Sequence, residues 1–269
     1  MDNFETATSL RPGLAGTFTW EVPAGWNVGR GAWGGLIIGA LVQAVTAAEP
    51  EPARTVRSLT AQLVAPVLPG RVVIDVRLFR RGAAVSVWTA TAVDAKGEPI
   101  GTATAVLGEP RTAAADADYG RWGMPSAPAI PPAIEVPLVD ITPPLGPEVA
   151  HHLWFRPVAG LPLSGPPAET VGWIHLREPV AHSAATLLAM ADAWWLVTFT
   201  MLDRMRPLAT VTFSANLLVD PATIAADEPL MHHGWASGSH QGFTSEQRRL
   251  WSADGRLVVD NLQSTVAVA

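Results

Sequence analysis

A single carboxylate, Asp192, lies in the middle of the most apolar stretch of the chain, HSAATLLAMADAWWLVTFTML, which runs from His182 to Leu202. Burying an ionised carboxylate costs on the order of several kcal/mol unless it is paired or hydrogen-bonded. Two interpretations follow. Asp192 either faces a structural partner or a solvent gap, or it lines a cleft where it binds water or transfers a proton.

The elements around Asp192 must be helical and buried. The stretch His182–Leu202 is long enough for five helical turns and is apolar on nearly every side, which predicts a helix surrounded by other elements. A second apolar helix is predicted for LIIGALVQAVTAAE, which follows Gly34 and Gly35 and ends near Glu49. Each predicted helix is followed by β-rich segments joined by turn signals such as Asp254-Gly255.

Composition excludes several classes of function. The 269 residues suffice for one large domain or two ordinary ones, and 48% of them are hydrophobic. The absence of cysteine rules out disulfides, a cysteine nucleophile and thiolate metal sites. A net charge of -6 argues against nucleic acid and against an anionic membrane surface as partners. The amino end lacks a signal peptide and no run looks like a membrane span, so we expect a cytoplasmic protein.

A proline-rich segment divides the chain. Nine of the 24 prolines lie between Pro110 and Pro147, where regular hydrogen-bonded ladders cannot form. We therefore predict an N-terminal unit over residues 1–109, a Pro/Ala-rich linker over 110–149 and a C-terminal unit over 150–269.

The two units repeat one pattern. SLTAQL at residues 58–63 matches TFSANL at residues 212–217 in character, and the hairpins that close the two units also correspond. Such a repeat predicts two copies of one structure, in which a long apolar helix is followed by an antiparallel sheet that wraps around it.

A sheet wrapped around one buried helix, present twice in a chain, resembles the double hotdog fold, an α+β architecture of two tandem antiparallel sheets. Several blocks, WGG at residues 33–35, SLTAQLVAPVLPG, LAMADAWW, LATVTFSANLLVDP and DNLQSTV, look like acyl-CoA thioesterase II, the TesB-like family. The resemblance covers nearly the whole chain outside the linker.

The resemblance implies hydrolysis of acyl-CoA thioesters without a metal or redox cofactor, coenzyme A being part of the substrate. It implies that Asp192, Thr210 and Gln263 hold the attacking water, and that the protein forms a homodimer or larger assembly. One departure is that Thr212 and Phe213 stand where the family commonly has an acid–histidine pair.

These residue types suit thioester hydrolysis. A thiolate leaves readily, because thiol pKa values lie near about 8.5, so the main needs are an oriented water and a stabilised oxyanion. Asp192 can act as general base, and the backbone N–H groups of Gly34 and Gly35 at the start of the first helix can bind the oxyanion. Ala105 is the hairpin-aligned counterpart of Gln263, and the first helix has no acid in its interior, which indicates one active half.

Other motifs are weaker. Gly29, Gly31 and Gly34 match a dinucleotide fingerprint, but hairpins follow in place of βαβ units. No GxSxG elbow occurs, and the adjacent histidine pairs at 151–152 and 232–233 do not form a metal-ligand set. The arginine pairs 80–81 and 248–249 are interpreted as solvated turn charges, one of which could meet coenzyme A phosphates.

Two other functions stay open, a hotdog hydratase or dehydratase acting on an enoyl or hydroxyacyl thioester, and a non-catalytic acyl-CoA binding protein.

Overall fold

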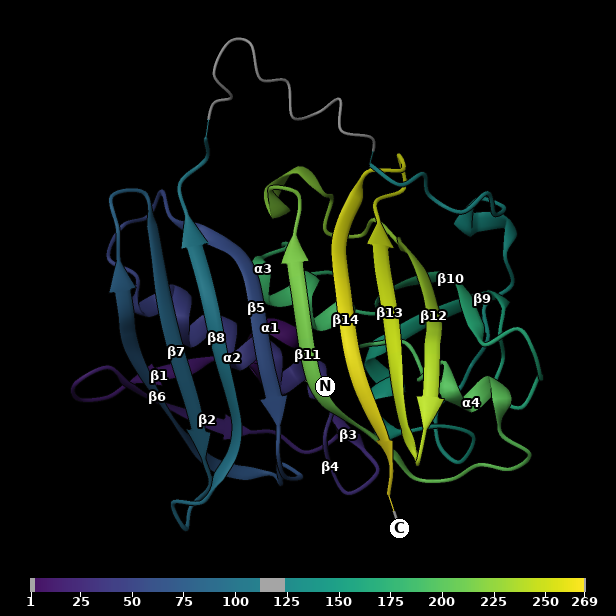
Figure 1. Ribbon diagram of the computed structural model, residues 1–269, viewed down its shortest axis with the longest axis horizontal. Coiled ribbons are helices and arrows are strands. Elements are labelled where there is room, and N and C mark those ends of the chain that lie inside the picture. The colour runs from purple at the N-terminus through teal and green to yellow at the C-terminus, as the bar shows by residue number, and fades with distance from the viewer. Residues whose placement is uncertain (1–2, 112–123, 269) are drawn as a thin grey trace.

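One antiparallel sheet of twelve strands dominates the computed structural model, which describes residues 3–111 and 124–268 (Figure 1). The strands run in the order β1-β2-β6-β7-β8-β5-β11-β14-β13-β12-β10-β9. The first half contains β1 (Leu10–Pro12), β2 (Thr17–Val22), β5 (Thr55–Leu63), β6 (Gly70–Arg81), β7 (Val85–Val93) and β8 (Pro99–Gly108). The second half contains β9 (Leu153–Ala159), β10 (Glu169–Leu176), β11 (Leu208–Leu217), β12 (Leu230–His240), β13 (Phe243–Trp251) and β14 (Leu257–Ala267). A separate two-stranded hairpin consists of β3 (Asn27–Val28) and β4 (Gly31–Ala32).

The two halves meet at β5 and β11, which lie side by side in the middle of the sheet (Figure 1). Ser58 is paired with Asn216, and Gln62 with Thr212. At the centre of this pairing the hydroxyls of Thr60 and Ser214, 154 residues apart, are 3.3 Å from each other. The segments that match in sequence are therefore neighbours related by an approximate two-fold axis, and the strand order reads as the same series outward from this axis on both sides.

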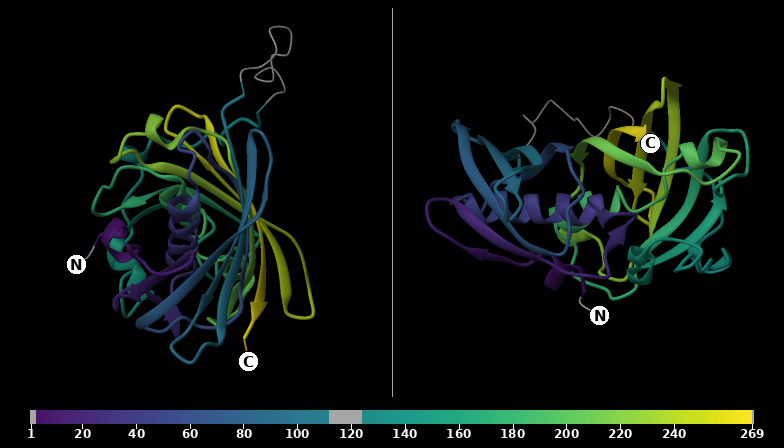
Figure 2. Two further views of the ribbon diagram at one scale, coloured as in Figure 1. Left: turned by 90° about the vertical axis from the view of Figure 1, so that its left-hand side faces the viewer. Right: turned by 90° about the horizontal axis from the view of Figure 1, so that it is seen from below.

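The helix α2 (Gly34–Ala48) lies on the concave side of the sheet, which curls around it (Figure 2). Ten of its residues are buried, since it is apolar on almost every side. It packs against the inner face of β5 to β8 and against α3. The helix ends at Ala48 because Glu49 is extended and Pro50 cannot continue it. The prediction of a buried helix after Gly34 is correct.

The predicted five-turn helix over His182–Leu202 is wrong. The structure has a short helix α3 (Ala184–Met190), then an irregular turn, then one turn of helix in α4 (Thr198–Met201). The helix stops because side chains of the sheet, Arg248 among them, bind backbone groups that would otherwise form hydrogen bonds within the helix. A short α1 (Phe4–Ala7) and the single turns η2 (Ala133–Glu135), η3 (Glu148–His152) and η4 (Pro221–Thr223) complete the helices of the described residues. None of the helices in these ranges is long and apolar enough to cross a membrane.

The predicted linker, residues 110–149, falls partly outside the described residues, which resume at 124. From there it runs without strands over the second half of the sheet. The carbonyl oxygen of Pro131 accepts a hydrogen bond from the indole of Trp173 (2.9 Å), and that of Val136 accepts one from Arg156 (2.6 Å). This part of the segment is therefore attached to the C-terminal half.

Candidate active site

Asp192 lies in the turn that follows α3, where only 9% of its surface is exposed. Its backbone is fixed on both sides. Its N–H donates to the carbonyl oxygen of Ala189 (2.9 Å), and its carbonyl oxygen accepts from the indole N–H of Trp33 (3.1 Å). Because Trp33 immediately precedes α2, Asp192 is held between the ends of the two buried helices.

The structure brings Asp192, Gln263 and Thr210 into one hydrogen-bonded chain. The hydroxyl of Thr210 on β11 donates to Oε1 of Gln263 on the neighbouring β14 (3.1 Å). The amide of Gln263 donates to Oδ1 of Asp192 (3.1 Å) and to Oδ1 of Asn261 (3.0 Å). Gln263 is completely buried. Three residues far apart in sequence therefore form one continuous polar group on the inner face of the sheet.

The two glycines at the start of α2 meet the same carboxylate. The backbone N–H of Gly35 lies near the Asp192 carboxylate and helps to lower the pKa of that group. A Cβ built on Gly34 would lie 2.6 Å from Oδ2 of Asp192, closer than real Cβ atoms approach another atom. The helix N-terminus, with its partial positive charge, thus faces the carboxylate directly. The role of the Gly34 and Gly35 N–H groups as oxyanion donors stays a prediction.

Burial controls the protonation of Asp192. Burial raises its pKa to about 6, while the positive charge of Arg248, the hydrogen bond from Gln263 and the N–H of Gly35 act in the opposite direction. A carboxyl group with a pKa near 6 is largely ionised at neutral pH yet basic enough to accept a proton from water. These properties are those of a general base.

Comparison with known proteins identifies the family. Residues 22–108 match the model of the acyl-CoA thioesterase N-terminal domain, and residues 124–267 match that of the acyl-CoA thioesterase C-terminal domain. The chain belongs to the acyl-CoA thioesterase family. The expected thioester hydrolysis and the resemblance to TesB-like enzymes are thereby confirmed. No match was found among curated proteins.

Solved structures agree with this family. A conserved protein of unknown function with a hot dog fold from Alicyclobacillus acidocaldarius is 26% identical, with a TM-score of 0.87, over 99% of this chain and 98% of that one. A provisionally assigned thioesterase II from Thermobifida fusca YX is 22% identical, with a TM-score of 0.82, over 100% of both chains. The acyl-CoA thioesterase II TesB2 from Mycobacterium marinum is 17% identical, with a TM-score of 0.75, over 98% of both chains.

Two charged residues of this thioesterase were missed by sequence reasoning. Arg248, which we interpreted as a solvated turn charge, lies within β13 and is completely buried, as is Glu246 two positions before it. Side chains alternate between the two faces of a strand, so Glu246, Arg248 and Leu250 all point to the inner face. Comparing this strand with its counterpart β7 would have drawn attention to these charges.

Three other arginine and histidine side chains singled out in the sequence have partners in the structure. Arg81 pairs with Glu49 (2.7 Å) near the end of α2. His232 and His233 point to opposite sides of β12, as expected, with His232 bonded to Thr170 (3.1 Å) and His233 to Glu169 (2.6 Å). Within residues 3–111 and 124–268 no three His, Asp or Glu side chains converge as a metal site requires.

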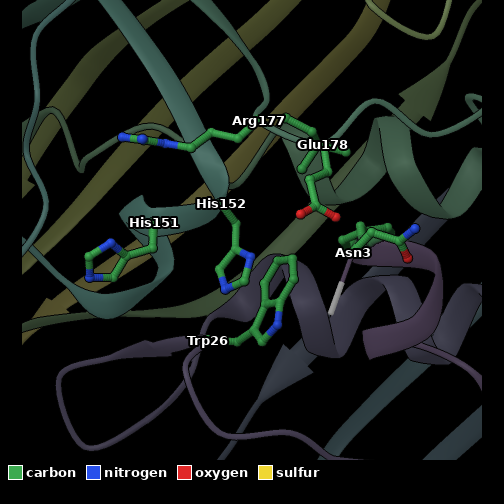
Figure 3. A pocket seen from close by; sticks show the side chains of 8 residues that line it. Asn3, Trp26, His151, His152, Arg177 and Glu178 are labelled. Carbon is green, nitrogen blue, oxygen red and sulfur yellow. The ribbon is translucent and has the colours of Figure 1, made fainter. Parts of the chain in front are cut away.

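A small cavity of about 120 Å³ lies near the active site but does not include it (Figure 3). It is lined by Asn3, Phe4, Trp26, His151, His152, Leu176, Arg177 and Glu178. The ring of His152 stacks on Trp26 with centroids 3.7 Å apart, and Trp26 stacks in turn on Trp33 at 6.3 Å. Since Trp33 bonds to the carbonyl oxygen of Asp192, these stacked rings connect the cavity wall to the backbone of Asp192.

Proposed function

We propose that this thioesterase hydrolyses acyl-CoA by direct attack of one water molecule, which Asp192 deprotonates and Gln263 and Thr210 orient. The observation that carries the proposal is the hydrogen-bonded chain from Asp192 through Gln263 to Thr210, placed at the N-terminus of α2. Each member offers a group that water can bind, and the chain fixes their directions relative to one another.

Gln263 can orient a water because its own orientation is fixed. Its amide nitrogen donates to both Asp192 and Asn261, so its carbonyl oxygen must face Thr210. A water that donates one hydrogen to the Asp192 carboxylate can donate its other hydrogen to this oxygen or to the hydroxyl oxygen of Thr210. The geometry supports a water site between these three side chains.

The reaction needs no covalent intermediate. Asp192 accepts one proton from water while the water oxygen bonds to the thioester carbonyl carbon, giving a tetrahedral oxyanion. The oxyanion then collapses, the C–S bond breaks and the thiolate of coenzyme A leaves, taking up the proton to give thiol and free acid. The low basicity of a thiolate makes this departure easy without a strong general acid.

The backbone N–H groups of Gly34 and Gly35 are the donors we propose for the oxyanion. N–H groups in the first turn of a helix have no partner within the helix, and the helix dipole favours negative charge there. Gly34 and Gly35 are the first two residues of α2, so both N–H groups lie in this first turn. The lack of a side chain on Gly34 lets both Asp192 and an acyl carbonyl approach the backbone closely.

We further propose that the fold is a double hotdog and that the protein works as a homodimer or larger assembly, without a metal or redox cofactor. The mirrored strand order and the helices on the concave side support the first statement. The proposed chemistry supports a reaction without a metal or redox cofactor, since Asp192 and the two polar side chains account for each proton transfer.

The hydratase or dehydratase alternative is not favoured. It would require a histidine paired with an acid at the reacting carbon. In the part of the chain that the structure describes, the carboxylate of Asp192 is hydrogen-bonded to the amide of Gln263. No histidine takes part.

The phosphates of coenzyme A are proposed to bind at Arg30. An open hollow of about 360 Å³ is lined by Arg30, Pro66 and Leu68. It lies on the hairpin that leads into α2, and this hairpin is tied to the segment after β5 by a hydrogen bond from Ala32 to Val67 (2.7 Å). Arg30 thus offers a cation four residues before Gly34, beside apolar groups that fit a pantetheine arm.

The test is a thiol-release assay over short, long and aromatic acyl-CoA substrates, with Asp192→Asn and the control Asp203→Asn in the exposed loop before β11. We expect steady thiol release by the wild type and the control, and a loss in Asp192→Asn of about 100-fold or more in kcat. A wild type that binds acyl-CoA tightly without releasing thiol would instead indicate a binding protein.

A second measurement tests whether Asp192 forms an acyl-enzyme that water opens at the aspartyl carbon. A single turnover in ¹⁸O-labelled water should place the label in the released acid alone. Label in the Asp192 carboxylate, found by mass spectrometry of its peptide, would show that this group acts as the nucleophile and would overturn the direct mechanism.

A further inference from the structure

A buried ion pair on β13 lies behind the turn that carries Asp192. Nη2 of Arg248 is 3.0 Å from Oε2 of Glu246, and neither side chain has any exposed surface. Two charges buried without water need further hydrogen bonds to offset the loss of hydration. The partners that supply these bonds identify what the pair does.

The partners all belong to the segment from the end of α3 to the first residue of α4. Nη1 of Arg248 donates to the carbonyl oxygens of Trp194 (3.1 Å) and Ala191 (3.5 Å), which flank Asp192 on both sides. Oε1 of Glu246 accepts hydrogen bonds from both the N–H and the hydroxyl of Thr198 (3.1 Å each), where α4 begins. The ion pair therefore replaces helical hydrogen bonds along this segment and keeps Asp192 in a turn.

In the described residues of the N-terminal half, the strand positions that correspond to Glu246 and Arg248 carry no such ion pair. Gln263 pairs with Phe213 and Glu246, whereas its counterpart Ala105 pairs with Leu59 and Trp88. By the same strand register, Ala90 of β7 is the counterpart of Arg248 of β13. Trp88 and Ala90 are both buried. Wrapping this sheet around a helix thus does not require buried charges at these positions, and their presence in one half points to a role in the active site.

We propose that Arg248 and Glu246 are positioning residues for hydrolysis, which hold the Ala191–Trp194 turn so that Asp192 meets Gln263 and the start of α2. This inference rests on the function proposed above for Asp192. The planar guanidinium suits the task because it presents several N–H donors in fixed directions, so one side chain can hold two carbonyl oxygens and one carboxylate.

The charge of Arg248 has a second effect on Asp192. Burial raises the pKa of Asp192, Arg248 lowers it, and Glu246 raises it again. These two residues on β13 are the charged groups that face it, while β14 contributes the neutral amide of Gln263 and α2 the N–H of Gly35. Removing the guanidinium should therefore raise the pKa of Asp192 above about 6.

The test compares Arg248→Met and Arg248→Lys with the control Arg256→Met, in which an exposed arginine of the turn between β13 and β14, paired with Asp254, is changed in the same way. In Arg248→Met we expect kcat to fall on the order of 100-fold, as for a misplaced catalytic group, and the midpoint of the pH profile of kcat/KM to rise by about one unit. Arg248→Lys keeps the charge, so kcat should fall while the midpoint stays. Arg256→Met should match the wild type.

The paired variant Glu246→Leu/Arg248→Met guards against misfolding, since apolar replacement of a whole buried ion pair is often neutral for stability. We expect it to fold and to show the same loss of kcat. A readout independent of activity is the titration of the Asp192 carboxyl carbon by NMR, which should move upward in Arg248→Met even if the substrate assignment is wrong. A variant with a lowered melting temperature but unchanged kcat and unchanged Asp192 titration would overturn the proposal.

Discussion

Gly34 and Asp192 are in such close contact that a Cβ on the glycine would lie 2.6 Å from Oδ2 of the carboxylate. The same Cβ would lie 2.9 Å from the side chain of Leu63 at the end of β5. The position is thus closed from two sides, and the need for glycine comes from this crowding rather than from an unusual backbone angle.

Gly34→Ala should therefore reduce activity. The methyl group must push the Asp192 carboxylate away from the start of α2, and an error of about 1 Å in a catalytic group can cost on the order of 100-fold in rate. We expect kcat/KM to fall at least about tenfold in a thiol-release assay, with the far-UV CD spectrum unchanged. Gly108→Ala is the control, since a Cβ there meets its nearest neighbour at 3.6 Å. Equal activity of the two variants would contradict a close role for Gly34.

The pH dependence of hydrolysis should report the ionisation of Asp192. Since burial raises its pKa to about 6, the general base is protonated and inactive below that pH and becomes active above it. We expect kcat/KM to rise with pH through a midpoint near 6 and to level off above about 7. A profile that is flat between pH 5 and 8 would assign the base to another group.

The free energy of unfolding should fall with rising pH over the range in which Asp192 ionises, whereas activity should rise. The folded state binds the proton of Asp192 more tightly than the unfolded chain, whose pKa is 3.8, so ionising it destabilises the folded protein as pH rises from about 4 to about 6. A difference of about two units corresponds to about 3 kcal/mol at most. Asp192→Asn should thus be more stable than the wild type at pH 8, and this gain should disappear near pH 4. Urea unfolding at both pH values measures it, and a gain equal at both would show that ionisation is not its cause.

The sequence predicted those parts of the site that depend on local pattern. The apolar run after Gly35 and the matched segments around Thr60 and Ser214 were sufficient to predict a buried helix and a repeated sheet. The register bears out the equivalence of Ala105 and Gln263, because Leu59 and Phe213 pair with them at corresponding places.

The second helix was predicted too long for a physical reason. The run His182–Leu202 contains no proline or glycine to stop a helix, so local propensity favours five turns. The helix is stopped by tertiary contacts. Arg248 and Glu246, more than forty residues later, bind the backbone between α3 and α4. A single sequence does not show which distant side chains will compete for those carbonyl and N–H groups.

Thr210 should matter through its hydroxyl alone. In Thr210→Val the shape is kept but the bond to Gln263 is lost, so we expect kcat to fall while KM changes little. Thr210→Ser should recover most of the activity because it restores the hydroxyl. The control is Thr104→Val on the exposed face of β8. If Thr210→Val retained full activity, the water would have to be oriented by Asp192 and Gln263 without Thr210.

Arg30 should affect binding of coenzyme A rather than the chemical step. A phosphate contact made equally in ground state and transition state raises KM when removed and leaves kcat unchanged. We expect Arg30→Ala to raise KM for acyl-CoA severalfold, with a weaker effect at high salt, where exposed charges are screened. The same variant should handle an acyl N-acetylcysteamine thioester as the wild type does, because that substrate carries no phosphate. Arg71→Ala, exposed on β6, serves as the control for a lost surface charge. Equal KM changes for both substrates would place Arg30 against the acyl or pantetheine part, and no change for either would remove the hollow beside Pro66 from the binding site.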